Sequence, residues 1–351
     1  KGYTCMGATM KLYQNEDIGL RREHTCCSLD DVEDARSVAY ALDMPYYVFN
    51  FADRFKTDVI DKFVHSYETG VTPNPCIDCN RYLKFAALQR RRAQLGFDYV
   101  ATGHYARRAF NERTGRFELR RGLDEAKDQS YVLYHLTQDD LAHMLFPLGE
   151  LTKPQVRELA EKHSFGNAHK AESQDICFVP DGDYASFIAR YMGFGGDAAR
   201  GDGKERVVPA AFEPGDIVDV GGRVLGRHTG LVHYTIGQRK GIGVAAPEPL
   251  YVVGKDADKN VLVVGPRSEL GVREVCAGDV NLISVAELDT PMRVTAKTHY
   301  RQRAQAAEAV MEGDQLVVRF DEAVARPAAG QSLVLYDGDA VVGGGTIEVS
   351  E

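Results

Sequence analysis

The sequence lacks an apolar run long enough to cross a lipid bilayer, so we expect no membrane-spanning segment. A secretory signal pattern and a regular, even set of cysteines are also missing. Seven irregularly spaced cysteines favour reduced thiols and a cytoplasmic location over a secreted disulfide scaffold. The net charge of −9 excludes a protein that coats nucleic acid indiscriminately, although it allows a local basic groove.

The length and the order of sequence patterns predict several domains, because 351 residues exceed the usual limit for one hydrophobic core. Before residue 180, strand patterns alternate with helix patterns, which is typical of a parallel sheet covered by helices. Two helices are expected. One is capped by Asn80, covers residues 81–95 and stops at Gly96, and the other covers 153–165 after Thr152 and Gln155, which stand at the spacing of a capping box. Beyond residue 200, short β runs such as "NVLVVGP" (260–266) and "QSLVLYDGD" (331–339) indicate an all-β region.

These patterns predict three domains. We expect an α/β domain over residues 1–184, a small central domain over 185–257 and a C-terminal β-barrel domain over 258–351.

Two cysteines three positions apart stand in "TPNPCIDCNRYLKF" (72–85). A structural zinc site needs a second such pair of cysteines, which this sequence lacks. In thioredoxin-like proteins no Pro-Asn-Pro precedes the cysteine pair, whereas one does here, so a redox dithiol also fits this sequence less well. A third interpretation uses Asn80 as a helix cap. The positive end of the helix would then stabilise the thiolate of Cys79, and Asp78 would offer a carboxylate for proton transfer.

A third cysteine of interest, Cys177, lies in "AESQDICFVPDGDY" (171–184). We expect a short strand over 176–179 and a tight turn over 180–182 that exposes the thiol. The alternative is an inert thiol in the core. The remaining cysteines, Cys5, Cys26, Cys27 and Cys276, are expected to be structural.

Motifs along nearly the whole chain carry a resemblance to a known family. They are "TPNPCIDCNRYLKF" (72–85), "DYVATGHYAR" (98–107), "LRRGLDEAKDQSYVLYHL" (119–136), "LFPLGELTKPQVRELA" (145–160), "ESQDICFVP" (172–180), "HYTIGQRKGIGV" (233–244), "YRQ" (300–302) and "VRFDEAVARPAAGQSLVLYDGD" (318–339) followed by "GGG". In order and spacing, the chain resembles the bacterial tRNA-specific 2-thiouridylases.

The resemblance implies a PP-loop, HUP-like parallel α/β domain, a small central domain and a C-terminal β-barrel. It implies an enzyme that uses ATP with Mg²⁺ to adenylate the wobble uridine of tRNA and then transfers sulfur from a cysteine persulfide to give 2-thiouridine. The implied partners are the anticodon region of tRNA and an upstream sulfur donor, such as a cysteine desulfurase or a sulfur-relay carrier.

The resemblance also implies roles for individual residues. Cys79 is the implied nucleophile and Cys177 the implied carrier of the persulfide. The implied nucleotide contacts are Met10 and Gly103, and the target base is expected against Asn74, Pro75 and Cys76. The implied tRNA contacts are His104, Lys127, Asp128, Gln129, His299, Tyr300 and Gln331.

The sequence departs from the family pattern at three points. The Ser-Gly-Gly-x-Asp-Ser loop that wraps ATP phosphates in the family is missing ahead of Lys1, so we expect this chain alone to bind ATP poorly or not at all. Some relatives carry an acid in place of Cys76, and His299 stands where an arginine often precedes the tyrosine.

Three alternatives stay open. The chain could be a truncated, catalytically inactive tRNA-binding homologue. It could be an iron–sulfur-dependent tRNA thiolase whose cluster is held by Cys76, Cys79 and Cys177. A third candidate is another PP-loop enzyme, one that adenylates a small carboxylate or amide.

Overall fold

The computed structural model describes residues 2–13, 29–169, 176–179, 181–194 and 208–348. The chain divides into two compact units, Lys1–Lys62 with Thr152–Val207, and Phe63–Leu151 with Val208–Glu351. Among the described residues, no helix is both long and apolar enough to cross a membrane.

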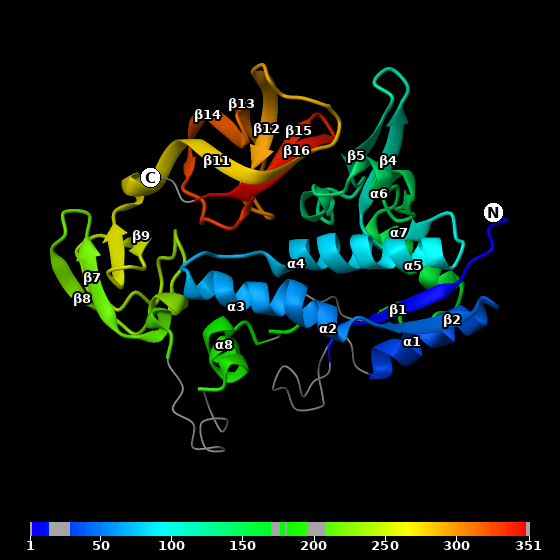
Figure 1. The fold of residues 1–351 in the computed structure, drawn as a ribbon, viewed down its shortest axis with the longest axis horizontal. Coiled ribbons are helices and arrows are strands. Elements are labelled where there is room, and N and C mark those ends of the chain that lie inside the picture. The colour runs from blue at the N-terminus through cyan, green and yellow to red at the C-terminus, as the bar shows by residue number, and fades with distance from the viewer. Residues whose placement is uncertain (1, 14–28, 170–175, 180, 195–207, 349–351) are drawn as a thin grey trace. The chain divides into compact units, whose positions relative to one another are not determined.

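The first unit contains a β-α-β arrangement. Strands β1 (Gly7–Lys11) and β2 (Tyr46–Asn50) pair in parallel over their whole length, and α1 (Leu29–Ala41) lies between them in the chain (Figure 1). Parallel strands need such a crossover because a tight turn can join only antiparallel strands. The predicted strand and helix patterns of this region are therefore confirmed.

Short helices make up the rest of the first unit. Their bounds are Ala52–Phe55 (α2), Lys56–Ile60 (η1, π-helical), Lys153–Lys162 (α7) and Tyr184–Met192 (α8), and α3 (Asp61–Glu68) begins at the end of this stretch of chain. Helix α7 begins with the predicted capping box, in which the Thr152 amide donates to Gln155 Oε1 at 2.8 Å. That prediction is confirmed.

Aromatic side chains form the core of the first unit. The ring centroids of Tyr13 and Phe55 lie 5.6 Å apart, those of Phe55 and Phe178 lie 5.6 Å apart, and those of Phe178 and Phe187 lie 5.3 Å apart. Tilted and edge-on ring pairs at these distances are favourable beyond the area that they bury. The chain near residue 178 is thus anchored in the core by a ring that is 1% exposed.

After the part of α3 that lies in the second unit, a continuous helical stretch carries two cysteines. It consists of α4 (Pro75–Asp78), the π-helical segment η2 (Cys79–Ala87) and α5 (Leu88–Gln94). The stretch ends before Gly96, whose φ of +73° matches the predicted glycine stop. Its start differs from the prediction, because the capping residue is Asn74 and Asn80 lies inside the helix.

Further short elements follow this helix in the second unit. They are β3 (Val100–Ala101) and β6 (Met144–Leu145), which pair in parallel, the hairpin β4 (Ala106–Asn111) and β5 (Arg116–Arg121), the 3₁₀ turn η3 (Ser130–Leu133), and α6 (Gln138–Ala142).

Four strands in the order β8-β7-β10-β9 form a separate small sheet. Their bounds are Gly215–Asp219 (β7), Val224–His228 (β8), Tyr251–Asp256 (β9) and Val261–Gly265 (β10), and the nearby 3₁₀ turns are η5 (Ala210–Phe212), η6 (Leu231–His233) and η7 (Arg267–Leu270). Ile217, Val252 and Leu262 are buried in its core.

Six strands close into a β-barrel in the order β11-β14-β13-β12-β15-β16, with β16 pairing back onto β11 (Figure 1). Their bounds are Gly271–Leu282 (β11), Met292–Lys297 (β12), Gln305–Glu312 (β13), Gln315–Ala325 (β14), Ser332–Asp337 (β15) and Ala340–Ile347 (β16). Closure removes unpaired sheet edges. The predicted C-terminal β-barrel is confirmed.

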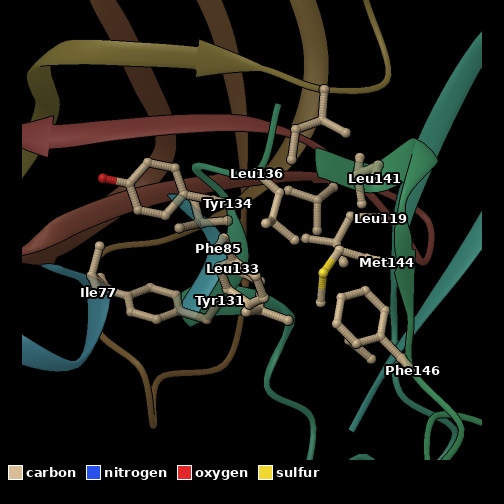
Figure 2. Packing of buried hydrophobic residues seen from close by; sticks show 14 of the residues in the cluster. Ile77, Phe85, Leu119, Tyr131, Leu133, Tyr134, Leu136, Leu141, Met144 and Phe146 are labelled. Carbon is tan, nitrogen blue, oxygen red and sulfur yellow. The ribbon is translucent and has the colours of Figure 1, made fainter. Parts of the chain in front are cut away.

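The main core of the second unit joins the cysteine helix to the barrel. Ile77 and Phe85 from the helix pack in one buried cluster with Tyr131, Tyr134 and Leu136 (Figure 2). The same cluster includes Val334, Tyr336 and Val341 from the barrel strands. Burial of this apolar face fixes the rotation of the helix about its axis.

The packing of this cluster gives a stability prediction. Leu136 is fully buried in it, so Leu136→Ala should lower the free energy of unfolding by about 2–5 kcal/mol, because the truncation leaves a cavity. Leu123→Ala is the matched control, since Leu123 is exposed, and should change stability by about 0.5 kcal/mol or less. Urea unfolding followed by circular dichroism measures both, and equal losses would show that Leu136 is not a core residue.

Candidate active site

The helix with Cys76 and Cys79 begins at a well-defined cap. Asn74 Oδ1 accepts a hydrogen bond from the Cys76 amide at 3.2 Å, and Pro75 occupies the first helical position, where an amide hydrogen would have no partner in the helix. Cys76 is exposed on the first turn, whereas Cys79 is one turn further along and only 8% exposed.

This start corrects the electrostatic argument made from the sequence. A helix dipole acts within the first turn, so its positive end faces Cys76 more directly than Cys79. The prediction that Asn80 caps the helix was wrong because Asn74 and Pro75 together already satisfy the requirements of a helix start. Asn80 instead is buried and donates from Nδ2 to the Val132 carbonyl at 3.0 Å.

A loop of the barrel contacts the segment that leads into this helix. Gln331 Nε2 donates to the Thr72 carbonyl at 2.8 Å and lies 3.5 Å from the Pro73 carbonyl. The Thr72 amide in turn donates to the Ala329 carbonyl at 2.9 Å. Gly330 has a φ of +86°, and a Cβ there would lie 2.3 Å from Val71 Cγ1, so only glycine fits this approach.

A second contact joins the helix to the barrel beyond Cys79. The Arg81 guanidinium makes a two-point ion pair with the Asp279 carboxylate of β11, one arm of which is 3.0 Å long. The hydrogen bond to Asp279 raises the pKa of Arg81 above its usual value. Neither residue was singled out in the sequence, because nothing local signals a contact between positions 81 and 279.

Tyr300 lies next to the segment Lys127–Gln129, as a shared binding surface would require. Its hydroxyl donates to the Asp128 carbonyl at 3.2 Å, and its ring centroid is 5.8 Å from that of Tyr131. Burial raises the pKa of Tyr300, and the charges of Asp128 and Cys76 add to the effect. Tyr131 also packs in one buried cluster with Ile77 of the cysteine helix, which brings Tyr300 near the start of that helix.

The side chains of Asp128 and Gln129 hold this segment in place. The Asp128 carboxylate accepts from the amides of Gly122 and Ser130 at 3.1 and 3.0 Å. Gln129 Oε1 accepts from the Tyr105 amide at 2.9 Å. Lys127 is half-buried, and its amide donates to the Asp124 carbonyl at 3.0 Å. These three hydrogen bonds accepted by the Asp128 and Gln129 side chains fix the conformation of the loop.

His104 is 8% exposed, and its Nδ1 lies 2.8 Å from Thr102 Oγ1. Burial lowers the pKa of His104 to about 3, and the charges of Lys84 and His135 act in the same direction. The imidazole is therefore neutral at physiological pH and offers hydrogen bonds rather than a positive charge. His299 is exposed, and partial desolvation together with Arg301 lowers its pKa.

Cys177 belongs to the first unit. Residues 176–179 form a turn, closed by a hydrogen bond from the Val179 amide to the Ile176 carbonyl at 2.9 Å, so the predicted strand was wrong. A strand would send Phe178 and Val179 to opposite faces, whereas the turn allows both to be buried. Cys177 itself is half-buried, and its carbonyl accepts from the Tyr13 hydroxyl at 2.9 Å.

The two implied nucleotide contacts lie in different units. Met10 is on β1 opposite Phe49, and Gly103 follows β3.

The remaining cysteines lie away from the cysteine helix in the sequence. Cys26 and Cys27 fall outside the described residues. Cys5 is exposed, and Cys276 on β11 is half-buried.

Within the described part of the chain, no three or more His, Cys, Asp or Glu side chains gather as a metal ion would require. A cluster on Cys76, Cys79 and Cys177 therefore has no support. Mg²⁺ differs from a structural zinc ion because it commonly binds through substrate phosphates, with few protein ligands.

Three family models match the chain in succession. The tRNA methyl transferase HUP domain matches residues 1–181, the tRNA methyl transferase PRC-barrel domain matches 205–266, and the aminomethyltransferase beta-barrel domain matches 272–347. The expected fold, a HUP-like α/β domain followed by a small central domain and a β-barrel, is confirmed. The first model matches from residue 1, which gives no support to the expectation of a missing leading segment.

Several named relatives are similar over nearly the whole chain. A tRNA-specific 2-thiouridylase MnmA of Moorella thermoacetica is 47% identical over 348 residues, which cover 99% of this chain and 93% of the relative. The proteins with the same name from Clostridioides difficile and Koribacter versatilis are 44% and 45% identical, and the matches cover 92% and 93% of their lengths and 100% and 99% of this chain.

The buried histidines predict a pH dependence of stability. Burial lowers the pKa values of His104 and His135 to about 3, so between about pH 6.5 and pH 3 the unfolded chain binds more protons than the folded chain. Stability should thus fall as the pH drops through this window, by on the order of 2–3 kcal/mol per histidine at pH 4.

The variant His104→Asn should show a shallower loss of stability between pH 7 and pH 4. His233→Asn is the control, because the side chain of His233 is exposed. Urea unfolding at several pH values, followed by tyrosine fluorescence since the chain has no tryptophan, measures the slope. An unchanged slope in His104→Asn would contradict the lowered pKa.

Proposed function

The chain belongs to the tRNA-specific 2-thiouridylase family, and on this basis we propose that it converts the wobble uridine of tRNA to 2-thiouridine. The observation that carries the proposal is that the second unit places two cysteines close to an aromatic side chain and a polar loop. This unit holds the exposed Cys76 and the buried Cys79 on one capped helix. Tyr300 contacts Asp128 and Tyr131, and Tyr131 packs in one buried cluster with Ile77 of that helix. A thiol next to a surface for an RNA base suits sulfur transfer to a nucleoside.

The first chemical step is the activation of the base. The oxygen at position 2 of uracil attacks the α-phosphorus of ATP, pyrophosphate leaves, and the oxygen becomes part of an AMP leaving group. This activation is necessary because an amide-like carbonyl does not exchange oxygen for sulfur unaided. Backbone groups at Met10 and Gly103 are the proposed contacts to ATP, and Mg²⁺ would enter with the phosphates.

The second step transfers sulfur. The terminal sulfur of a persulfide on Cys177 attacks carbon 2 of the base while the Cys79 thiolate attacks the inner sulfur of that persulfide. The persulfide S–S bond breaks, AMP leaves with the former oxygen, and a disulfide between Cys79 and Cys177 forms. A cellular dithiol then reduces this disulfide by two electrons and resets the enzyme.

The residues around Cys79 have proposed supporting roles. Asp78, one position before Cys79, would accept the thiol proton. Asn74, Pro75 and Cys76 would form the wall against which the extruded uracil lies, since the base must leave its stack to reach a buried sulfur.

The proposed tRNA contacts are of two kinds. Tyr300 offers an aromatic face for stacking, and the neutral His104 offers a hydrogen bond to a base edge. The other proposed contacts are Lys127, Asp128, Gln129 and His299, whereas the Gln331 amide nitrogen, the remaining implied contact, is bonded to the Thr72 carbonyl. The anticodon region of tRNA is the proposed partner, together with a sulfur-donor protein in the cytoplasm that loads Cys177.

The domain limits that we propose for this activity are 1–184 for the catalytic domain, 185–257 for the central domain and 258–351 for the barrel domain. The family models support a three-part division with similar limits.

The two-cysteine mechanism predicts that Cys79→Ser and Cys177→Ser each lower 2-thiouridine formation by roughly a thousandfold or more, because a hydroxyl carries no persulfide sulfur and is a poor nucleophile. The dissociation constant for tRNA should change by less than about twofold. Cys276→Ser, on barrel strand β11, is the matched control and should retain full activity.

Mass spectrometry of nucleosides from the tRNA product measures the exchange of oxygen for sulfur, and the Moorella thermoacetica relative serves as the positive control reaction. Normal activity in either serine variant would remove the two-cysteine mechanism. A product that gains a methyl group would contradict the proposed reaction. Methyl transfer is the reaction in the name of the first family model, the tRNA methyl transferase HUP domain.

A further inference from the structure

The barrel holds the cysteine segment at both of its ends. Before the helix, Gln331 Nε2 donates to the Thr72 carbonyl at 2.8 Å, and beyond Cys79, Arg81 pairs with Asp279. Residues 72–81 are thus held between two barrel residues that stand 52 positions apart in the chain, one at position 279 and one at position 331. The two attachments differ in strength, because the Arg81–Asp279 pair is half-exposed and such pairs contribute little.

The attachment at Gln331 is the more specific of the two. Its side chain is half-buried, and both of its contacts to residues 72 and 73 use the amide nitrogen. The Thr72 amide, bonded to the Ala329 carbonyl, adds a second link in the opposite direction. Gly330 packs directly against Val71, since a Cβ at position 330 would lie only 2.3 Å from Val71 Cγ1.

The consequence for the site follows from the chain geometry. Thr72 lies two residues before the cap at Asn74, and Pro75 restricts the backbone between that cap and Cys76. A helix then carries the orientation rigidly to Cys79, because its rise and rotation per residue are fixed. A shift of the Thr72 carbonyl would therefore displace both thiols together.

We propose that Gln331 is a positioning residue, which holds residues 72–79 in the place where the wobble uridine meets Cys79, rather than a residue that grips the tRNA. The expected change in the rate of thiolation rests on the proposed function. The structural consequences of the positioning role for the segment are independent of that activity.

The test replaces the amide donor without changing its shape. In Gln331→Glu a carboxylate would face two carbonyl oxygens, so the contact becomes repulsive at neutral pH. We expect the single-turnover rate of thiolation at saturating tRNA to fall by about tenfold or more, while the dissociation constant for tRNA changes by less than about twofold. Gln305→Glu is the matched control, because the Gln305 side-chain amide donates to the carbonyl of Arg303, two positions earlier, at 3.4 Å.

Lowering the pH provides a rescue. A protonated glutamic acid has one O–H donor, which can restore the contact to the Thr72 carbonyl. The pKa of a glutamic acid in this half-buried place should lie above its ordinary value of about 4.3. The rate of Gln331→Glu relative to wild type should therefore rise between pH 8 and pH 5, whereas the relative rate of Gln305→Glu should stay constant.

A readout without tRNA separates this proposal from the proposed function. In the tRNA-free chain, Gln331→Glu should speed hydrogen exchange at the Thr72 amide and change the rate at which iodoacetamide alkylates the exposed Cys76. If wild type forms no 2-thiouridine, the proposed function fails, but exchange and alkylation still decide whether Gln331 holds the segment.

Two results would overturn the positioning role. One is a loss of tRNA affinity in Gln331→Glu by about tenfold with an unchanged rate at saturation, which would make Gln331 an RNA contact. The other is wild-type exchange at Thr72 together with wild-type alkylation of Cys76, which would show that the segment keeps its place without the amide.

Discussion

The hydrogen bonds from the Gln331 amide to the carbonyls of Thr72 and Pro73 hold the segment that leads into the cysteine helix. Each bond alone contributes about 1 kcal/mol, but their location matters more than their strength. They act one and two residues ahead of the Asn74 cap. The position of the first two helical turns therefore depends on them. Packing of Ile77 and Phe85 into the buried cluster then fixes the rotation of the helix (Figure 2).

One scaffold therefore carries both the proposed nucleophile, Cys79, and the proposed RNA surface. The barrel supplies Gln331 and Asp279 to the helix, and it supplies Tyr300 to the surface beside Asp128. Catalysis of group transfer depends on holding reacting atoms within a fraction of an ångström of their productive positions. A closed barrel suits this task because it has no free edge and deforms little. The β-barrel is thus part of the catalytic arrangement that we propose, besides its proposed part in binding tRNA.

The sequence predicted features that depend on neighbouring residues. The capping box of Thr152 and Gln155, the glycine stop at Gly96 and the short β runs of the barrel all follow from local rules, and the structure confirms them. The start of the cysteine helix also had a local signal, because Asn followed by Pro is typical of a cap and a first helical residue, but Asn80 was interpreted as the cap. The turn at 176–179 was missed because burial of two adjacent side chains depends on the surrounding core.

Contacts between distant positions could not be predicted in this way. Gln331 and Thr72 are 259 positions apart, and Arg81 and Asp279 are 198 apart, so no spacing rule connects them. The family resemblance implied that Gln331 contacts RNA, and it gave no sign of the hydrogen bond from the Gln331 amide to the backbone beside the helix cap. The most direct measurement is an experimental structure of the chain bound to tRNA. We predict that Gln331 Nε2 remains hydrogen-bonded to the Thr72 carbonyl while the extruded uridine lies against Asn74. A Gln331 side chain turned onto the RNA, with Thr72 released from the barrel, would contradict this arrangement.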